Sequence, residues 1–258
     1  MWLLGIPFHR MGSKKIKDAI QQTIESNEKA IFLNLNIHGM VKALEHPWMH
    51  NFLRQAHIVF CDGDGVRWGL RILRHKPPPK IPTTRWIWPL CAFAGNHGYR
   101  MYFLGGAPGV ADAAMARLKQ SIPKLQVVGT HHGQFIKDGE ENDRILEEIN
   151  QLKPDILMVC MGMPTQEKWI MDNWQNLDVH VFLKGGAVFD YVSDKLGKAP
   201  KWMIRANLEW LFRISEEPGR LLGRYLWDIP FFFVNVLIEK AARILFRADP
   251  KEYHRHRP

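Results

Sequence analysis

The sequence predicts an α/β fold in which a parallel sheet carries helices on both faces and a helical segment follows it. Between residues 29 and 189, short apolar runs alternate with amphipathic segments, the pattern of parallel strands joined by crossover helices. After Ala199 this alternation stops, and aromatic and arginine side chains recur at helical spacing. We therefore expect a sheet domain over residues 1–198 and a helical appendage over residues 199–258.

The expected elements follow from the apolar runs and from the helical periodicity between them. The predicted strands are Ala30–Leu35, Ile58–Cys61, Arg100–Leu104, Gln126–Val128, Ile156–Cys160 and Val179–Leu183, and the clearest helices are Val110–Gln120, Glu140–Leu152 and Thr165–Trp174. The stretch Lys76–Thr84 contains consecutive prolines, which cannot continue a helix, and is predicted to be a loop. Loops in that position often cover a site.

The appendage ends in a segment, residues 229–247, with apolar residues on more than one face and basic residues near its end. This pattern suits a helix lying in a membrane interface. Packing of the same helix on the domain or on a second subunit is an equal alternative. The longest strongly apolar run, Ile229–Ile238, is shorter than the ~20 residues that span a bilayer, so no transmembrane passage is expected.

The composition is that of a folded globular protein, with 46% hydrophobic and 24% charged residues among 258. The formal charge is +9, and most of the excess follows Lys195, which predicts a polyanionic partner. Cys61, Cys91 and Cys160 lie far apart, which argues against a disulfide framework or a cysteine zinc site and favours a reducing, cytosolic compartment. The start, MWLLGIPFHRM, lacks the basic leader and long apolar core of a secretory signal.

Two non-enzymatic classes also fit the charge. A nucleic-acid-binding protein would use it, but no helix-turn-helix, RNP or zinc signature accompanies it. A membrane-surface protein would use the same appendage without any chemistry.

The segment CDGDG at residues 61–65 places Asp62 and Asp64 directly after a predicted strand, where open α/β sheets bind their ligands. Asp62 can act as a general base toward an incoming hydroxyl. Alternatively, Asp62 and Asp64 together can hold a divalent metal against a nucleotide pyrophosphate. In a purely structural alternative, the aspartates cap the next helix and the glycines permit the turn.

Further glycine-rich turns follow other predicted strands. In FLGGAPGV, Gly105 and Gly106 precede a helix whose backbone N–H groups suit a phosphate, although the segment is not a G-x-G-x-x-G fingerprint. In KGGAVFD, Gly185 and Gly186 permit close approach of a ligand to the backbone. A tight structural turn is the alternative at each of them.

The segment MGMPTQEKW occupies the same topological position after another strand. Gly162 and Pro164 fix its turn, so that Thr165, Gln166 and Glu167 occupy the first helical turn and can face the edge of the sheet. A helix cap is the alternative role for Glu167.

Two other sequence features carry no chemistry in our interpretation. His131 and His132 are adjacent in an extended segment, so their side chains are expected to point in opposite directions, and no carboxylate partner is evident. The chain has no G-x-S-x-G, which leaves serine hydrolase chemistry unsupported.

Taken together, these segments resemble the WecG/TagA/CpsF family of glycosyltransferases (glycosyltransferase family 26) from about Ile31 to Tyr225. The matching parts are AHIVFCDGDGV, FLGGAPGVA, VGTHHGQF, KPDILMVCMGMPTQEKWI, GGAVFD and APKWMIRANLEWLFRISEEPGRLLGRYL. The resemblance implies a Rossmann-like fold and a cytosolic enzyme of cell-envelope polymer synthesis at the inner face of the membrane.

The resemblance also implies the reaction and its participants. Family members move a sugar from a UDP-sugar donor to a sugar on polyprenyl pyrophosphate, with inversion and without a required metal, so no cofactor is expected. The implied partners are these two substrates and the anionic inner-membrane surface, with no nucleic acid and with a homo-oligomer left open.

The family's site residues carry over by motif. The family's presumed base matches Asp62, the Gln of G-x-P-x-Q-E matches Gln166, and the Asn of the family's T-x-N matches Asn36. The predicted UDP-sugar-binding residues are Asn34, Lys80, Arg85, Gly105, Gly106, Gly162, Gly185 and Gly186, together with Arg213, Arg220 and Arg224, which match appendage arginines thought to close over the diphosphate.

The chain departs from the family pattern at two places that bear on the donor. Asn34 stands where the family has Thr, and KIPTTRWIW stands where many members have an arginine followed by G-x-D, so that Lys80 or Arg85 replaces this arginine. Asp64 is often apolar in the family, which weakens the metal alternative. We therefore expect a neutral hexose such as glucose as the donor sugar, with N-acetylmannosaminyl (or mannosaminuronyl) transfer as the alternative.

Overall fold

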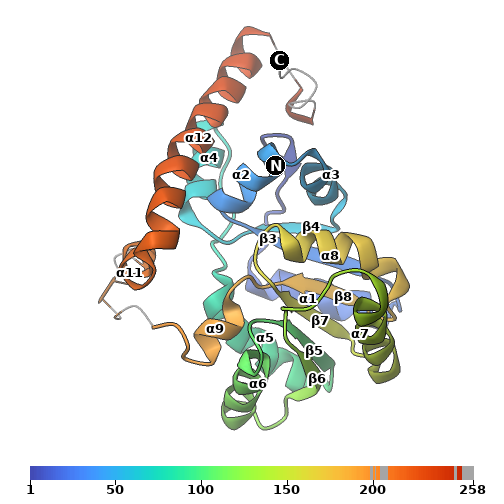
Figure 1. The fold of residues 1–258 in the computed structure, drawn as a ribbon. Coiled ribbons are helices and arrows are strands. Elements are labelled where there is room, and N and C mark those ends of the chain that lie inside the picture. The colour runs from blue at the N-terminus through green and yellow to red at the C-terminus, as the bar shows by residue number, and fades with distance from the viewer. Residues whose placement is uncertain (198–199, 201, 204–208, 247–248, 252–258) are drawn as a thin grey trace.

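The computed structural model describes residues 1–197, 200, 202–203, 209–246 and 249–251. Its centre is a six-stranded sheet of order β4-β3-β8-β7-β5-β6, in which every neighbouring pair is parallel (Figure 1). The strands are β3 (Ala30–Leu35), β4 (Ile58–Cys61), β5 (Arg100–Gly105), β6 (Gln126–His131), β7 (Ile156–Cys160) and β8 (Val181–Lys184). The predicted α/β, Rossmann-like fold is confirmed.

Most strands begin and end close to their predicted bounds because a parallel sheet covered on both faces is built from continuous apolar runs. The main differences are at strand ends. β6 continues through Gly129 to His131, beyond the predicted end at Val128, and β8 begins at Val181 instead of Val179. Gly129, Thr130 and His131 hide the end of β6 from an apolar pattern, whereas Val179 extends the apolar pattern of β8 beyond the residues that pair in the sheet.

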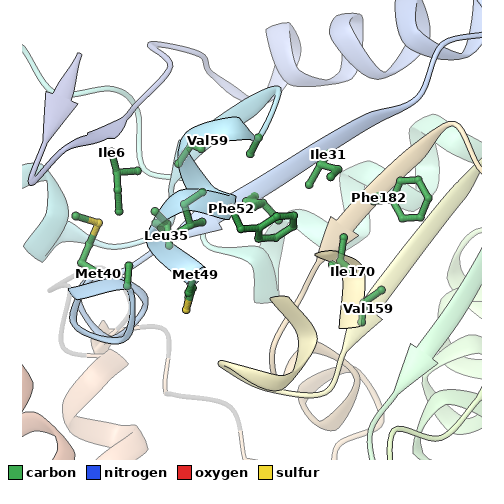
Figure 2. Packing of buried hydrophobic residues seen from close by; sticks show 14 of the residues in the cluster. Ile6, Ile31, Leu35, Met40, Met49, Phe52, Val59, Val159, Ile170 and Phe182 are labelled. Carbon is green, nitrogen blue, oxygen red and sulfur yellow. The ribbon is translucent and has the colours of Figure 1, made fainter. Parts of the chain in front are cut away.

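One core lies between the sheet and the helices α2 (Ile37–Glu45), α3 (Pro47–Gln55), α4 (Asp64–Ile72), α7 (Gly139–Leu152) and α8 (Thr165–Asn173), the last followed by the 3-10 turn η1 (Trp174–Asn176). Figure 2 shows Ile31 and Leu35 of β3 pointing into this core beside Met40 of α2 and Phe52 of α3. The alternate residues of the same strand, including Phe32, point into the opposite core.

The second core lies on the other face of the sheet. It is covered by α1 (Ser13–Glu25), α5 (Thr83–His97), α6 (Val110–Ser121) and α9 (Val188–Val192). The predicted proline loop ends at Pro82, where α5 begins. It is pinned at two points, since Arg67 Nε donates to the Pro78 carbonyl at 3.2 Å and the Ile81 N–H donates to the Cys61 carbonyl at 2.8 Å.

The N-terminal segment forms a small antiparallel hairpin of β1 (Trp2–Leu3) and β2 (Ile6–Pro7). Leu3, Leu4 and Ile6 are fully buried in the first core. This hairpin is covered in turn by the C-terminal part of the chain, because the backbone N–H of Leu4 donates to Glu239 Oε2 at 2.8 Å.

The appendage contains α11 (Glu209–Glu216) and the 28-residue helix α12 (Pro218–Leu245), which packs along α2 and α4 (Figure 1). Phe232 and Val236 are fully buried in the first core, and a side chain at Gly69 of α4 would collide with the Phe232 ring. Every exposed residue of α12 from Leu222 to Leu245 is apolar or glycine. α12 therefore packs on the domain with one face and leaves an apolar opposite face exposed.

Candidate functional site

The carboxyl edge of the sheet gathers most of the predicted site residues, because all strands run in one direction and end at the same edge. Asn36 follows β3, Asp62 follows β4, and the glycine turns at 105–106, 162 and 185–186 follow β5, β7 and β8. Residues that are distant in the sequence thus lie along the same edge of the sheet.

Asp62 is held at the end of β4 by two backbone hydrogen bonds. Its own N–H donates to the Leu35 carbonyl at 2.9 Å, and its Oδ1 accepts from the Thr83 N–H at 3.1 Å. Thr83 is the first residue of α5, so the carboxylate also satisfies one of the N–H groups that a helix start leaves unpaired. An oriented carboxylate at this edge has the geometry of a general base.

The side chains of Asn36 and Asn34 each hydrogen-bond to another residue of the protein. Asn36 is the N-cap of α2, where its side-chain oxygen accepts from the Gly39 N–H at 3.0 Å. Asn34 is 8% exposed and donates to the Thr83 hydroxyl. Thr83 was not among the sequence predictions, although it joins Asn34 to Asp62. The only available signal was the pair of threonines that closes the proline loop.

Asp64, considered as a metal ligand, is paired with two cations. Its Oδ1 lies 2.8 Å from Arg67, and its Oδ2 accepts from Lys80 of the proline loop. Burial acts to raise the pKa of Asp64, but the hydrogen bonds from Lys80 and Arg67 outweigh burial and lower it below its ordinary value. Among the described residues, no group of three or more His, Cys, Asp or Glu side chains could hold a metal ion.

Lys80 and Arg85, predicted to contact the donor, lie at different places. Lys80 is engaged by Asp64 and braces the loop beside β4. Arg85 lies exposed in the first turn of α5. Of these two cationic side chains, Arg85 is the more exposed.

The glycine turns combine a packing role with an open backbone. A side chain at Gly105 would lie 2.2 Å from the Cys160 carbonyl oxygen, so the structural alternative for this glycine holds. Gly186 adopts φ +61 and faces open space, since an added Cβ would meet nothing within 4 Å. Gly106 and Gly162 also have positive φ, and Gly185 packs on Cys160. An added Cβ at Gly162 would also meet nothing within 4 Å, so the open backbone lies at Gly162 and Gly186.

Gln166 ties α8 to the turn after β8. Its Oε1 accepts from the Gly186 N–H at 3.0 Å, and its Nε2 donates to Glu167 Oε1 at 3.3 Å. Glu167 does not cap α8, which is a correction to the structural alternative above. It instead forms an ion pair with Lys184, with 2.5 Å between Nζ and Oε1 and with both side chains buried. A lysine at the end of a buried strand was the sequence signal for this pair.

His131 and His132 depart from the expected geometry. Their rings lie 4.4 Å apart instead of pointing in opposite directions, because β6 ends at His131 and the chain turns there. His131 Nδ1 lies 2.8 Å from the His132 carbonyl oxygen, and His132 Nδ1 accepts from the Gln134 N–H. Both side chains therefore serve the turn, in agreement with a structural role.

The appendage reaches the site region through an ion-pair cluster. Arg224 of α12 lies 3.4 Å from Asp228 of the same helix, and Asp228 lies 2.7 Å from His38 in the first turn of α2. Arg213 and Arg220 occupy positions in α11 and α12, but their side chains lie outside the described part of the structure. Residues 199, 201 and 204–208 of the APKWMIRANLEW motif and residues 252–258 of the basic tail also lie outside the described residues.

The segment Leu221–Leu245 of α12 is 25 residues long and apolar enough, by length and composition, to cross a membrane. One such helix is weak evidence of a span, because a helix in the core of a soluble protein meets the same criteria. Phe232, Val236 and Glu239 of this segment are buried against the domain.

The sequence is similar to a known protein family and to named proteins over most of its length. The family model described as "Glycosyl transferase WecG/TagA/CpsF family" matches residues 1–244. An N-acetylglucosaminyldiphosphoundecaprenol N-acetyl-beta-D-mannosaminyltransferase of Bacillus subtilis (strain 168) is 25% identical over 233 residues, which is 90% of this chain and 88% of that protein. A protein of the same name from Staphylococcus aureus (strain MRSA252) is 26% identical over 232 residues, covering 86% and 88% of the two chains.

Proposed function

The chain belongs to the WecG/TagA/CpsF family of glycosyl transferases, and we propose that it transfers an N-acetylmannosaminyl group from a UDP-linked donor to N-acetylglucosamine on a polyprenyl diphosphate. The named activity of the Bacillus and Staphylococcus relatives supports this sugar and acceptor. It favours the alternative of the sequence analysis over the expected glucose. The departures at Asn34 and Lys80, which had suggested glucose, say little about the donor, since both side chains are engaged within the protein.

The observation that carries the proposed chemistry is the Asp62 carboxylate, fixed by the Thr83 N–H at the carboxyl edge. Asp62 takes the proton of the acceptor hydroxyl, whose oxygen attacks the anomeric carbon of the donor. The bond from that carbon to the β-phosphate oxygen breaks, and its electron pair leaves with UDP. Attack on the face opposite to UDP inverts the anomeric configuration.

The departing diphosphate needs positive charge and room at the edge of the sheet. The N–H groups of Gly106 and Gly186 already donate within the protein, to the Cys160 carbonyl and to Gln166, so we assign to the open turns at Gly162 and Gly186 only the space for the diphosphate. We assign the charge to Arg85 and to the appendage arginines Arg213, Arg220 and Arg224. Guanidinium groups bind phosphate oxygens in pairs and can take the role that a metal fills in other transferases. Asp64, the carboxylate that could have held a metal, is paired with Lys80 and Arg67, which supports arginines in place of a metal.

The exposed face of α12 supports a location at the cytoplasmic face of the membrane that holds the lipid acceptor. The exposed side chains include Leu222, Leu226, Trp227, Val234, Leu237, Ile238 and Leu245. An apolar helix face of this kind can lie in the interfacial region of a bilayer, and nearby basic groups are attracted to anionic lipids.

The test is a donor screen with a synthetic lipid-diphosphate N-acetylglucosamine as the acceptor. UDP-N-acetylmannosamine, UDP-N-acetylglucosamine and UDP-glucose are supplied separately, and the product is characterised by mass spectrometry and by the anomeric coupling in NMR. We expect transfer from UDP-N-acetylmannosamine, with inversion. Transfer of glucose with no transfer of N-acetylmannosamine would instead support the neutral hexose expected from the sequence.

A further inference from the structure

A buried carboxylate on α12 lies between a histidine of the sheet domain and an arginine of its own helix. Asp228 is 5% exposed. Its Oδ2 lies 2.7 Å from His38 Nδ1 and 3.4 Å from Arg224 Nε. Because a carboxylate only accepts hydrogen bonds, the His38 ring donates from Nδ1. The two contacts join α2, Asp228 and the Arg224 guanidinium.

This cluster lies beside the proposed catalytic edge. His38 is in the first turn of α2, directly after the Asn36 cap. Asn36 in turn lies against Gly63, where an added side chain would meet the Asn36 Cβ at 3.4 Å. Gly63 is the neighbour of Asp62 in the chain. A chain of contacts therefore connects Arg224 to the residues around Asp62.

Packing alone does not require a carboxylate at position 228. Further along the same face of α12, Phe232 and Val236 pack on the domain with apolar side chains. A buried carboxylate is costly unless charged or hydrogen-bonding partners compensate it. Its presence here is explained by what it holds, because the ion pair at Nε restrains the Arg224 side chain, which is 27% exposed.

We infer that Asp228 and His38 are positioning residues that hold Arg224 toward the diphosphate of the donor. The inference rests on the proposed function, because it assumes that a nucleoside diphosphate binds at this edge. A guanidinium held in place before binding loses less conformational freedom when the ligand arrives, so positioning appears as tighter binding of UDP.

The test measures UDP affinity by calorimetry for the full chain and its variants. We expect Arg224→Ala to raise Kd about tenfold, the scale of one charge-assisted contact. Asp228→Asn and His38→Leu should each raise Kd about threefold to tenfold. In the Arg224→Ala background, Asp228→Asn should add nothing, since both changes act through the same guanidinium.

Two further variants separate positioning from general loosening of the helix. His38→Asn should stay near the wild-type Kd, because its amide nitrogen can replace Nδ1 as a donor to Asp228. Glu239→Gln weakens another buried contact of α12, to Leu4 and Arg243, and should leave Kd unchanged. If Asp228→Asn does not fold, as judged by urea unfolding, the comparison of His38→Leu with His38→Asn decides.

Several results would overturn the inference. An unchanged Kd in Asp228→Asn, or effects of Asp228→Asn and Arg224→Ala that add, would remove the positioning role. Sugar transfer by the wild type together with an unchanged Kd in Arg224→Ala would refute the positioning role and leave the proposed function standing. A wild-type protein that neither binds UDP nor transfers sugar would refute both.

Discussion

The ammonium group of Lys184 lies 2.5 Å from Glu167 Oε1, and both side chains are at most 1% exposed. The pair joins the end of β8 to the first turn of α8. Glu167 Oε1 also accepts from Gln166, whose own oxygen accepts from the Gly186 N–H. The buried pair therefore supports the backbone turn to which the donor diphosphate is assigned.

The first prediction concerns the stability that depends on this pair. Lys184→Met leaves a buried carboxylate without its cation, and Glu167 Oε2 has no other partner among the described residues. Breaking such a pair costs about 3–5 kcal/mol of unfolding free energy. The double variant Lys184→Met with Glu167→Gln should recover much of the loss, because neither charge remains. Urea unfolding measures both.

Lys168→Met is the matched control for that experiment. Lys168 lies in the same helix as Glu167 and pairs with Asp172, but these side chains are 52% and 43% exposed. We expect a cost below about 1 kcal/mol. Equal losses in Lys168→Met and Lys184→Met would show that burial of the pair does not matter.

The second prediction concerns Asp62 as the base. In Asp62→Asn the side-chain oxygen can still accept from the Thr83 N–H, so the fold around α5 is retained while the base is lost. Turnover should fall about 10²- to 10⁴-fold, with UDP affinity nearly unchanged. Steady-state kinetics and calorimetry measure the two quantities. Full activity in this variant would remove Asp62 from the role.

The strands and the carboxyl-edge residues were predictable from sequence because their signals are local. β4 and β7 are unbroken apolar runs and β3 is one interrupted only by Asn34, and Asp62 follows directly after β4. A carboxylate or a glycine at the end of such a run is placed at the edge by the parallel topology alone. The bounds of β3, β4 and β7 matched the prediction for this reason.

The partners of these residues were not predictable, because they come from distant parts of the chain. Asp64 had been interpreted as a possible metal ligand, but Lys80, which engages it, lies beyond α4 in the proline loop. Asp228 meets His38 across a separation of 190 residues. Neither pairing leaves a periodic signal in the sequence.

The third prediction follows from the Asp64 contacts. Because Lys80 and Arg67 engage Asp64, we expect sugar transfer to continue in EDTA. Asp64→Asn should weaken the bracing of the proline loop and lower turnover less than Asp62→Asn does. Kinetics with and without EDTA test this. Activity that is lost in EDTA and restored by Mg²⁺ or Mn²⁺ would contradict the arginine-based mechanism.

The fourth prediction concerns the exposed face of α12. Leu226 and Leu237 are 69% and 54% exposed, so replacing both with Glu should leave folding intact. It should reduce binding to vesicles of phosphatidylglycerol and phosphatidylethanolamine at least tenfold, since each leucine contributes apolar area and each Glu is repelled. Flotation measures binding. Deleting the helix instead would be uninformative, because Phe232 and Val236 belong to the core.

Ile136→Glu is the matched control for the membrane experiment. Ile136 is 66% exposed and lies in the loop after β6, outside α12. An exposed apolar residue there is replaced by the same charge, so the variant tests whether any such change reduces vesicle binding. Equal loss of binding in both proteins would argue against α12 as the contact surface.

The fifth prediction is a pH dependence of stability from Glu239. Burial, the largest effect, raises the pKa of Glu239 above its ordinary value of 4.5, although the hydrogen bonds from Leu4 and Arg243 act against it. The folded protein therefore holds this proton more tightly than the unfolded chain does. The stability linked to it is fully present below pH 4.5 and is lost as the pH rises through the raised pKa.

Glu239→Gln is neutral at every pH and should lack this loss. The free energy of unfolding in urea, measured from pH 4.5 to 7.5, should shift in favour of the variant relative to the wild type as the pH rises. The ion pair with Arg243 forms only where Glu239 is ionised, and its effect is already contained in the direction of the Glu239 pKa shift, so its loss in the variant does not reverse the expected change. Glu147→Gln, a change at an exposed position of α7, controls for the loss of a carboxyl group and should leave the two curves parallel. Parallel curves for Glu239→Gln as well would mean that burial does not hold the proton on Glu239.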